Sequence, residues 1–207
     1  MSEDENPKWR KKKAATLAYK NGHSLYLIIT NRCSNTCIFC PKFNQYKLYG
    51  QDLLLEKEPS FEEVMAAVAV VEPTGIDEIV FCGFGESLLR LELVVRIAQE
   101  LKRRYSYPIR INTDGQANLV HDRDIVPELA GLVDTISVSL NASDPATYIK
   151  LCDTPFGDKG FFGVCDFIRL AKQQIPNVIA SVVDYPGVDL DACRALVLSL
   201  GVSFRVR

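Results

Sequence analysis

Three cysteines close together in the chain give its first chemical signal. The segment TNRCSNTCIFC places Cys33, Cys37 and Cys40 at a C-x3-C-x2-C spacing. A structural zinc site closes its tetrahedron with four Cys or His ligands, and the two histidines, His23 and His121, are isolated in the sequence. Thiolates are also the ligands of iron–sulfur clusters. Three of them on one loop suit a [4Fe-4S] cluster with one iron left open for a small chelating molecule.

The other four cysteines show no paired spacing. They fall in predicted strands and helices, where a free cysteine is usually a small buried apolar side chain. No signal peptide is visible and no apolar run reaches the length of a membrane span. The predicted location is therefore cytoplasmic, where a disulfide framework is not expected. These cysteines are Cys82, Cys152, Cys165 and Cys193.

Length and charge limit the overall organisation. The chain has 207 residues and a formal net charge of −2, so it carries no overall basic field that would attract nucleic acid. We expect a charged N-terminal tail at residues 1–22 and one core domain at residues 23–207, since this length suits a single substantial core.

Six short β-rich runs alternate with helical patterns along the core. This alternation predicts an α/β fold with six parallel strands joined by crossover helices, either as an open sheet or as a barrel. Functional sites in both architectures form at the carboxyl ends of the strands. The expected strands are residues 24–30, 77–83, 108–113, 134–142, 177–184 and 202–207, and the expected helices are 60–72, 88–105, 122–132, 144–152, 161–174 and 189–201.

Polar side chains gather where these strands end. Strand alternation places Arg110 and Asn112 on one face of the third strand, and Ser137, Ser139 and Asn141 on one face of the fourth. A buried parallel strand is normally apolar, and unpaired polar groups there would be costly. The pattern indicates a site, although hydrogen bonds to the local backbone could also explain it.

Four elements together resemble the radical S-adenosylmethionine (radical SAM) superfamily. The cysteine spacing, with Phe39 before the last cysteine, resembles its cluster motif. GFGES at residues 83–87 looks like its Gly-Gly-Glu-Pro element, with Ser87 in place of proline. INTDG at 111–115 is similar to its Thr-Asn-Gly element, with Asp114 in place of asparagine, and SLNA at 139–142 resembles its Ser-Leu-x-Ala element. With YLIITNRCSNTCIFC and FRVR, the likeness is closest to the small TatD-linked radical SAM group.

The resemblance implies a partial (β/α)6 TIM-like barrel and a defined chemistry. Cys33, Cys37 and Cys40 would hold a [4Fe-4S] cluster and form its catalytic group, with S-adenosylmethionine on the fourth iron. One electron from a reductant such as a flavodoxin or ferredoxin would cleave S-adenosylmethionine to a 5′-deoxyadenosyl radical, which abstracts hydrogen from a substrate. The implied cofactor-binding residues are Phe39, Gly83, Gly85, Glu86, Asn112, Ser139 and Asn141.

The substrate is left open by the sequence. Arg205 and Arg207 share a face of the last strand, and with Arg110 they could bind a carboxylate or phosphate. Each could equally form a structural ion pair with Asp184 or Glu86.

Three functional hypotheses remain at this point. The first is a radical enzyme acting on a small molecule, and the second is a modifier or activase of a protein or RNA partner. The third is a non-catalytic iron–sulfur or zinc binding module. A TatD-type protein is a possible functional associate under the first two.

Overall fold

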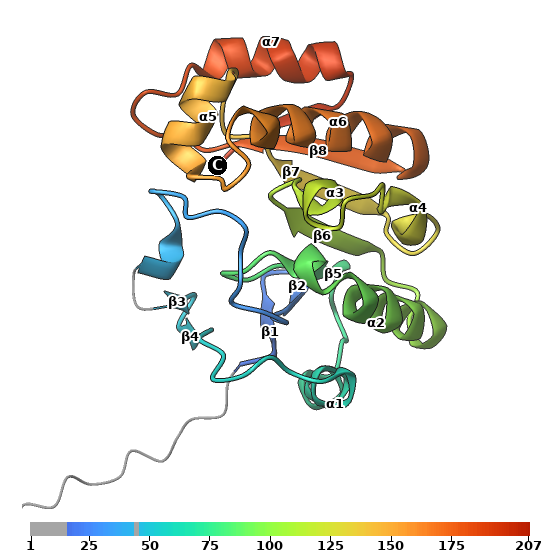
Figure 1. The fold of residues 1–207 in the computed structure, drawn as a ribbon. Helices are drawn as coiled ribbons and strands as arrows, with labels where there is room; N and C mark the ends of the chain where they lie inside the picture. Colours follow the sequence, from blue (N-terminus) through green and yellow to red (C-terminus); the bar gives the residue numbers. More distant parts are fainter. Residues whose placement is uncertain (1–15, 44–45) are drawn as a thin grey trace, which may run out of the picture.

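A curved seven-stranded sheet forms the centre of the protein. The computed structural model describes residues 16–43 and 46–207. The strand order is β1-β2-β5-β6-β7-β8-β9, and all neighbouring pairs from β2 onward are parallel. Figure 1 shows the sheet running through the molecule. Its strands are β1 (Ala18–Asn21), β2 (Ser24–Leu27), β5 (Glu78–Phe81), β6 (Ile109–Thr113), β7 (Thr135–Ser139), β8 (Asn177–Val182) and β9 (Ser203–Val206).

The six parallel strands are the six that the sequence predicts, and the α/β class is confirmed. β1 was not expected, because Ala18–Asn21 falls in the predicted N-terminal tail. It pairs antiparallel with β2, with Ala18 opposite Leu27, and so covers an edge that would otherwise be open. Most of the predicted tail, residues 1–15, lies outside the described residues.

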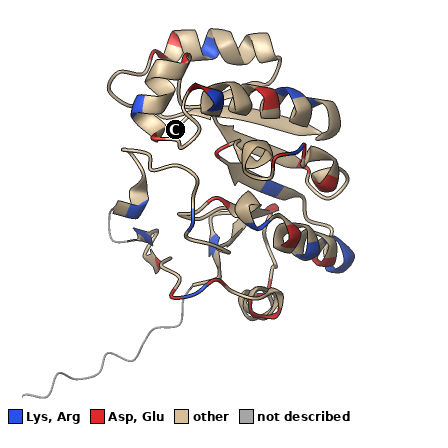
Figure 2. Ribbon diagram, in the orientation of Figure 1, with Lys and Arg blue, Asp and Glu red and all other residues tan. Residues whose placement is uncertain are grey.

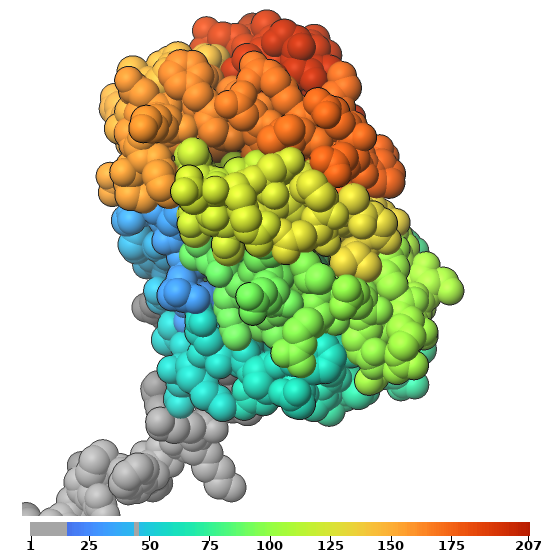
Figure 3. Space-filling view, turned by 45° about the vertical axis from the view of Figure 1, so that its right-hand side comes forward, coloured from blue at the N-terminus to red at the C-terminus, as the bar shows by residue number. Residues whose placement is uncertain are grey.

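The helices cover one face of the sheet. Figure 3 shows them packed side by side over that face. Beneath them, strand residues such as Leu25, Ile79 and Phe81 are fully buried, so this face holds the main hydrophobic core. The helices are α1 (Phe61–Val71), α2 (Leu91–Arg104), α3 (Ala117–Val120), α4 (Val126–Leu129), α5 (Pro145–Cys152), α6 (Asp158–Gln174) and α7 (Leu190–Leu200), with short 3-10 turns η1 (Pro41–Phe43) and η2 (Ser87–Arg90).

Local capping signals set several of these helix ends. Ser60 and Glu63 form the predicted capping box at the start of α1. The side chains of Asp144 and Asp189 accept backbone N–H bonds at the starts of α5 and α7. The predicted helix at residues 122–132 is wrong in its extent, since only α4 forms there, with Pro127 in its first turn.

The outer surface carries both signs of charge. Figure 2 shows Lys and Arg interspersed with Asp and Glu along α2 and α6, in keeping with the net charge of −2. Among the described residues, no helix combines the length and apolar content that a bilayer crossing needs.

A polar ion pair occupies the inner face of the sheet. Arg110 Nε and Nη2 donate to the Glu78 carboxylate at 3.0 and 2.7 Å, and Ser24 Oγ donates to Glu78 at 2.8 Å. Hydrogen bonding from Arg110 is the first cause of the lowered pKa of Glu78. Arg110 is thus a structural residue, paired with Glu78 rather than with Asp184 or Glu86.

Replacing one member of this pair should be costly. We expect Arg110→Met to lower the free energy of unfolding by about 3 kcal/mol at pH 7, because Glu78 would keep a half-buried, unpaired charge. The double variant Arg110→Met/Glu78→Leu should lose less than Arg110→Met alone. Urea denaturation of both variants measures this, and an equal or greater loss in the double variant would contradict it.

Candidate functional site

The three clustered cysteines line one cavity of about 340 Å³ at the carboxyl ends of the parallel strands. The cysteine segment follows β2, and the other walls come from the residues that follow β5, β6, β7 and β8. Every site residue predicted from the sequence lies in this cavity wall. These residues are Cys33, Cys37, Phe39, Cys40, Gly83, Gly85, Glu86, Asn112, Ser139 and Asn141.

The placement of the thiols suits a cluster better than a single ion. Within residues 16–43 and 46–207, no group of three His, Cys, Asp or Glu side chains converges on one metal position. A zinc site needs such convergence. In a cubane cluster each thiolate binds a different iron atom, so the ligands surround a volume instead of a point. Three thiols around one cavity therefore fit a [4Fe-4S] cluster.

The backbone of the cysteine segment is attached to the end of α5. Thr36 N donates to Cys152 O at 3.1 Å, and Ile38 N donates to Leu151 O at 3.0 Å. These two bonds flank Cys37 on both sides. They fix the segment across the carboxyl end of the sheet without any contribution from the cysteine side chains.

A buried side-chain network holds the same segment from a second direction. Gln116 Nε2 donates to Asn35 Oδ1 at 2.6 Å and to the Tyr148 hydroxyl at 2.8 Å, while Thr154 Oγ1 donates to Gln116 Oε1 at 2.6 Å. All four side chains are buried. Because buried polar groups are costly when unpaired, this network favours one position of Asn35, between two of the cysteines.

The Gly-rich turn after β5 packs directly on the cysteine segment. A Cβ atom at Gly85 would lie 2.4 Å from Thr30 O and 2.6 Å from Arg32 O, so only glycine fits there. Glu86 N donates to Arg32 O at 2.7 Å. The close approach carries the almost fully buried Glu86 carboxylate into the cavity wall.

Asp114 is a site residue that sequence reasoning missed. Its Oδ2 accepts from Ser34 Oγ at 2.5 Å and lies 3.8 Å from Cys33 Sγ, and its backbone N donates to Glu86 Oε2 at 2.6 Å. Burial raises the pKa of both carboxyls, and the charge of Asp114 raises the pKa of Glu86 further. A cation bound beside the two would favour their ionised forms. The one signal in the sequence was an acidic residue where the resembling motif has an amide.

Cys82 was also misassigned. It was expected in the strand core, but it is half-buried and lines the cavity. Its side chain follows the inner-face alternation of β5, two residues beyond Val80. The other three lone cysteines are buried as expected.

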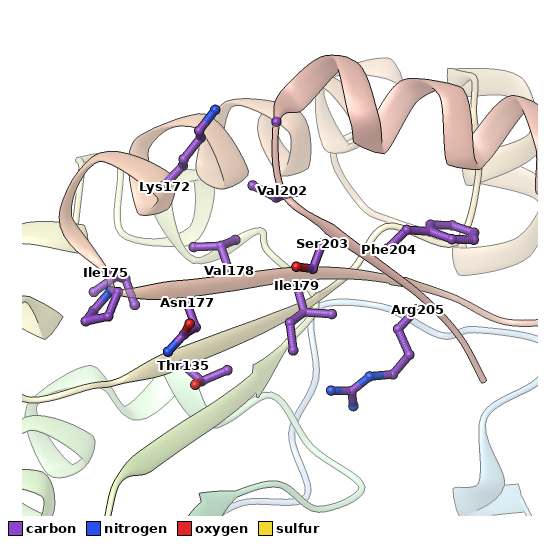
Figure 4. A pocket seen from close by; sticks show the side chains of 12 residues that line it. Thr135, Lys172, Ile175, Asn177, Val178, Ile179, Val202, Ser203, Phe204 and Arg205 are labelled. Atoms are coloured by element: carbon purple, nitrogen blue, oxygen red, sulfur yellow. The ribbon is translucent and has the colours of Figure 1, made fainter.

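The arginines of the last strand separate into two places. Arg207 lines the cysteine cavity, and its Nη2 donates to Asn141 Oδ1 at 3.1 Å. Arg205 lines a second cavity of about 670 Å³ near the amino ends of β7, β8 and β9. Figure 4 shows Arg205 on the same side of the sheet as Thr135 and Asn177. This larger cavity holds no cysteine and lies away from the strand ends where sites form.

The chain matches the family model of the Radical SAM superfamily over residues 27–198. It is 27% identical over 139 residues to GTP 3′,8-cyclase from Paenarthrobacter nicotinovorans, a match that covers 67% of this chain and 37% of that protein. The chain thus spans less than half the length of this curated relative.

Solved structures share the fold. Streptococcus suis SuiB bound to precursor peptide SuiA superposes with a TM-score of 0.64 at 13% identity, covering 89% of this chain and 38% of that one. Methylornithine synthase (PylB) superposes with a TM-score of 0.58 at 17% identity, covering 89% and 52%. These similarities support the predicted partial barrel.

The two buried carboxyls make stability depend on pH. Because the pKa of Asp114 is raised by folding, its contribution to stability is present at low pH and is lost as the pH rises through the folded pKa. We therefore expect Asp114→Asn to raise the free energy of unfolding of chelator-treated protein by about 1–2 kcal/mol at pH 8, since one pKa unit is worth about 1.4 kcal/mol. The gain should shrink toward pH 5.

Urea denaturation at pH 5, 6, 7 and 8 measures this gain. Asp166→Asn, at an exposed position on α6, is the matched control and should show no pH-dependent gain. A loss of stability at pH 8 in Asp114→Asn would contradict the assignment.

Proposed function

Since the chain belongs to the radical SAM superfamily, we propose that it is an enzyme that cleaves S-adenosylmethionine reductively. The observation that carries the proposal is the single cavity in which Cys33, Cys37 and Cys40 meet Glu86. The cluster and S-adenosylmethionine would together supply a 5′-deoxyadenosyl radical that abstracts hydrogen from the substrate. The protein binds, orients and shields these groups.

The carboxyl pair is suited to the amino group of S-adenosylmethionine. Glu86 and Asp114 are adjacent and buried in the cavity wall, and an ammonium placed there would meet acceptors of opposite charge. Leu88 N and Asp114 N donate to the two oxygens of Glu86, and these bonds hold the carboxylate in one orientation.

The remaining cavity residues suit the rest of the cofactor. Phe39 presents an aromatic face for adenine and is itself held by Tyr185, at 5.8 Å between ring centroids. Ser139 and Asn141 offer polar groups for the ribose and carboxylate. Asn112 is oriented by Arg110 Nη1, which donates to its Oδ1 at 2.7 Å.

A macromolecular partner is a second candidate for the substrate side. Ile38 and Phe43 flank Cys40, and they are 49% and 61% exposed. Exposed apolar side chains beside a redox centre suit a docking protein, either the one-electron reductant, such as a flavodoxin or ferredoxin, or a peptide substrate. SuiB, which shares the fold, was solved with a precursor peptide.

The finer assignments rest on sequence motifs. They are membership of the small TatD-linked group, association with a TatD-type protein, and a cytoplasmic location. The cavity geometry supports catalysis over a non-catalytic module, because a closed metal staple needs neither a buried carboxyl pair nor three thiols around an open volume.

Product formation tests the proposal. The protein is reconstituted anaerobically with iron and sulfide and given dithionite and S-adenosylmethionine, and 5′-deoxyadenosine is quantified by mass spectrometry. We expect product from the wild type and from the control Cys165→Ala, which changes a buried cysteine of α6. Cys37→Ala should lose at least 100-fold of the rate, because the cluster loses a ligand.

Glu86→Ala separates cofactor binding from cluster binding. It should keep the iron content of the wild type but need a higher S-adenosylmethionine concentration, because the acceptor for the amino group is gone. A wild type that binds stoichiometric zinc and no iron–sulfur cluster would contradict the proposed function.

A further inference from the structure

A chain of hydrogen bonds connects a cation to one of the cluster-binding cysteines. Arg207 Nη2 donates to Asn141 Oδ1 at 3.1 Å, and Asn141 Nδ2 donates to Cys152 Sγ at 3.8 Å. The Cys152 thiol is in turn hydrogen-bonded to the Cys37 thiol. The chain therefore runs through four side chains from the end of β9 to the cysteine segment.

Backbone contacts place Cys152 opposite Cys37. The residues on either side of Cys37 are bonded to the last turn of α5, Thr36 N to Cys152 O and Ile38 N to Leu151 O. Cys152 is fully buried and Asn141 nearly so. The thiol contact is thus built into the way the cysteine segment docks, and it does not depend on a mobile surface side chain.

The direction of the chain is fixed when Cys37 is a metal ligand. A ligating cysteine is a thiolate, which can only accept a hydrogen bond. The Cys152 sulfur already accepts from Asn141, so its single hydrogen is available for Cys37. Every donor then points from Arg207 toward the thiolate, and hydrogen bonds aligned in this way polarise one another.

Arg207 is well placed to drive this polarisation. Among the described residues, the charges that act most on Arg207 are those of Cys82, Cys37, Arg205 and Cys152, with no carboxylate among them. Arg110, on the neighbouring part of the inner face, is instead neutralised by Glu78. Hydrogen bonds to charged partners are about twice as strong as neutral ones.

We propose that Arg207, Asn141 and Cys152 form a hydrogen-bond chain that ends on Cys37 and raises the reduction potential of the cluster. The proposal rests on the proposed function, because it requires the cluster on Cys37. Hydrogen bonds to cluster sulfurs are one of the factors that set the potential. They stabilise the reduced state most, because that state carries the larger negative charge. Cys152 and Arg207 are positioning residues that act through Cys37.

The test is the midpoint potential of the reconstituted cluster, measured without S-adenosylmethionine by redox titration followed by electron paramagnetic resonance. Cys152→Ala should make reduction threefold to tenfold less favourable, where tenfold corresponds to about 59 mV for one electron. Cys152→Ser, which keeps a hydrogen-bond donor, should recover most of this shift. Arg207→Met should shift the potential in the same direction as Cys152→Ala.

Two control variants separate the chain from general effects. Cys165→Ala removes another buried cysteine, and Arg205→Met removes the other arginine of β9, which lies in the second cavity. Both should keep the wild-type potential. A shift of equal size in either control would overturn the proposal.

The outcomes for the chain itself are also decisive. Cys152→Ala with full iron content and an unchanged potential would overturn it. If Cys152→Ala does not load, Arg207→Met decides, and a potential equal to wild type overturns the proposal. A wild type without any cluster would instead contradict the proposed function, and the inference with it.

Discussion

The docking of the cysteine segment across the carboxyl end of the sheet is the constraint on which the site depends. Two independent sets of bonds hold it. Backbone bonds at residues 36 and 38 attach it to the end of α5, and side chains of the turn after β6 hold residues 34 and 35. Loops alone rarely keep three ligands in place, and a site is more precise when rigid elements support it. Here the supports are the last turn of a helix and the end of a parallel strand.

The same docking explains the unusual electrostatics of the cavity. It brings two carboxyls, three thiols and an arginine into a small volume that is mostly closed to water. Burial of the carboxyl pair is unfavourable in isolation. It becomes reasonable in a site that receives a cation beside Glu86 and Asp114. Strain of this kind at a functional site is offset elsewhere, in this protein by the apolar core beneath the helices.

Much of the fold could be predicted because its signals are local. Period-two runs located the six parallel strands, and residues such as Ser60, Asp144 and Asp189 marked helix starts. Every predicted site residue lined the cavity because parallel strands bring their carboxyl ends to one edge. The contacts among them were not predictable. Asn35 meets Gln116 across 81 positions and Tyr148 across 113, and no local pattern encodes such pairs. β1 was missed because a four-residue strand beside a charged segment has little periodicity.

The central claim is that the three thiols hold a [4Fe-4S] cluster with one iron open to S-adenosylmethionine. The most direct measurement is the electron paramagnetic resonance spectrum of the reduced, reconstituted protein with and without S-adenosylmethionine. A change in g values on addition, absent with methionine-free buffer and weakened in Glu86→Ala, is the predicted result. A fully loaded cluster whose spectrum is identical in both conditions would contradict the claim.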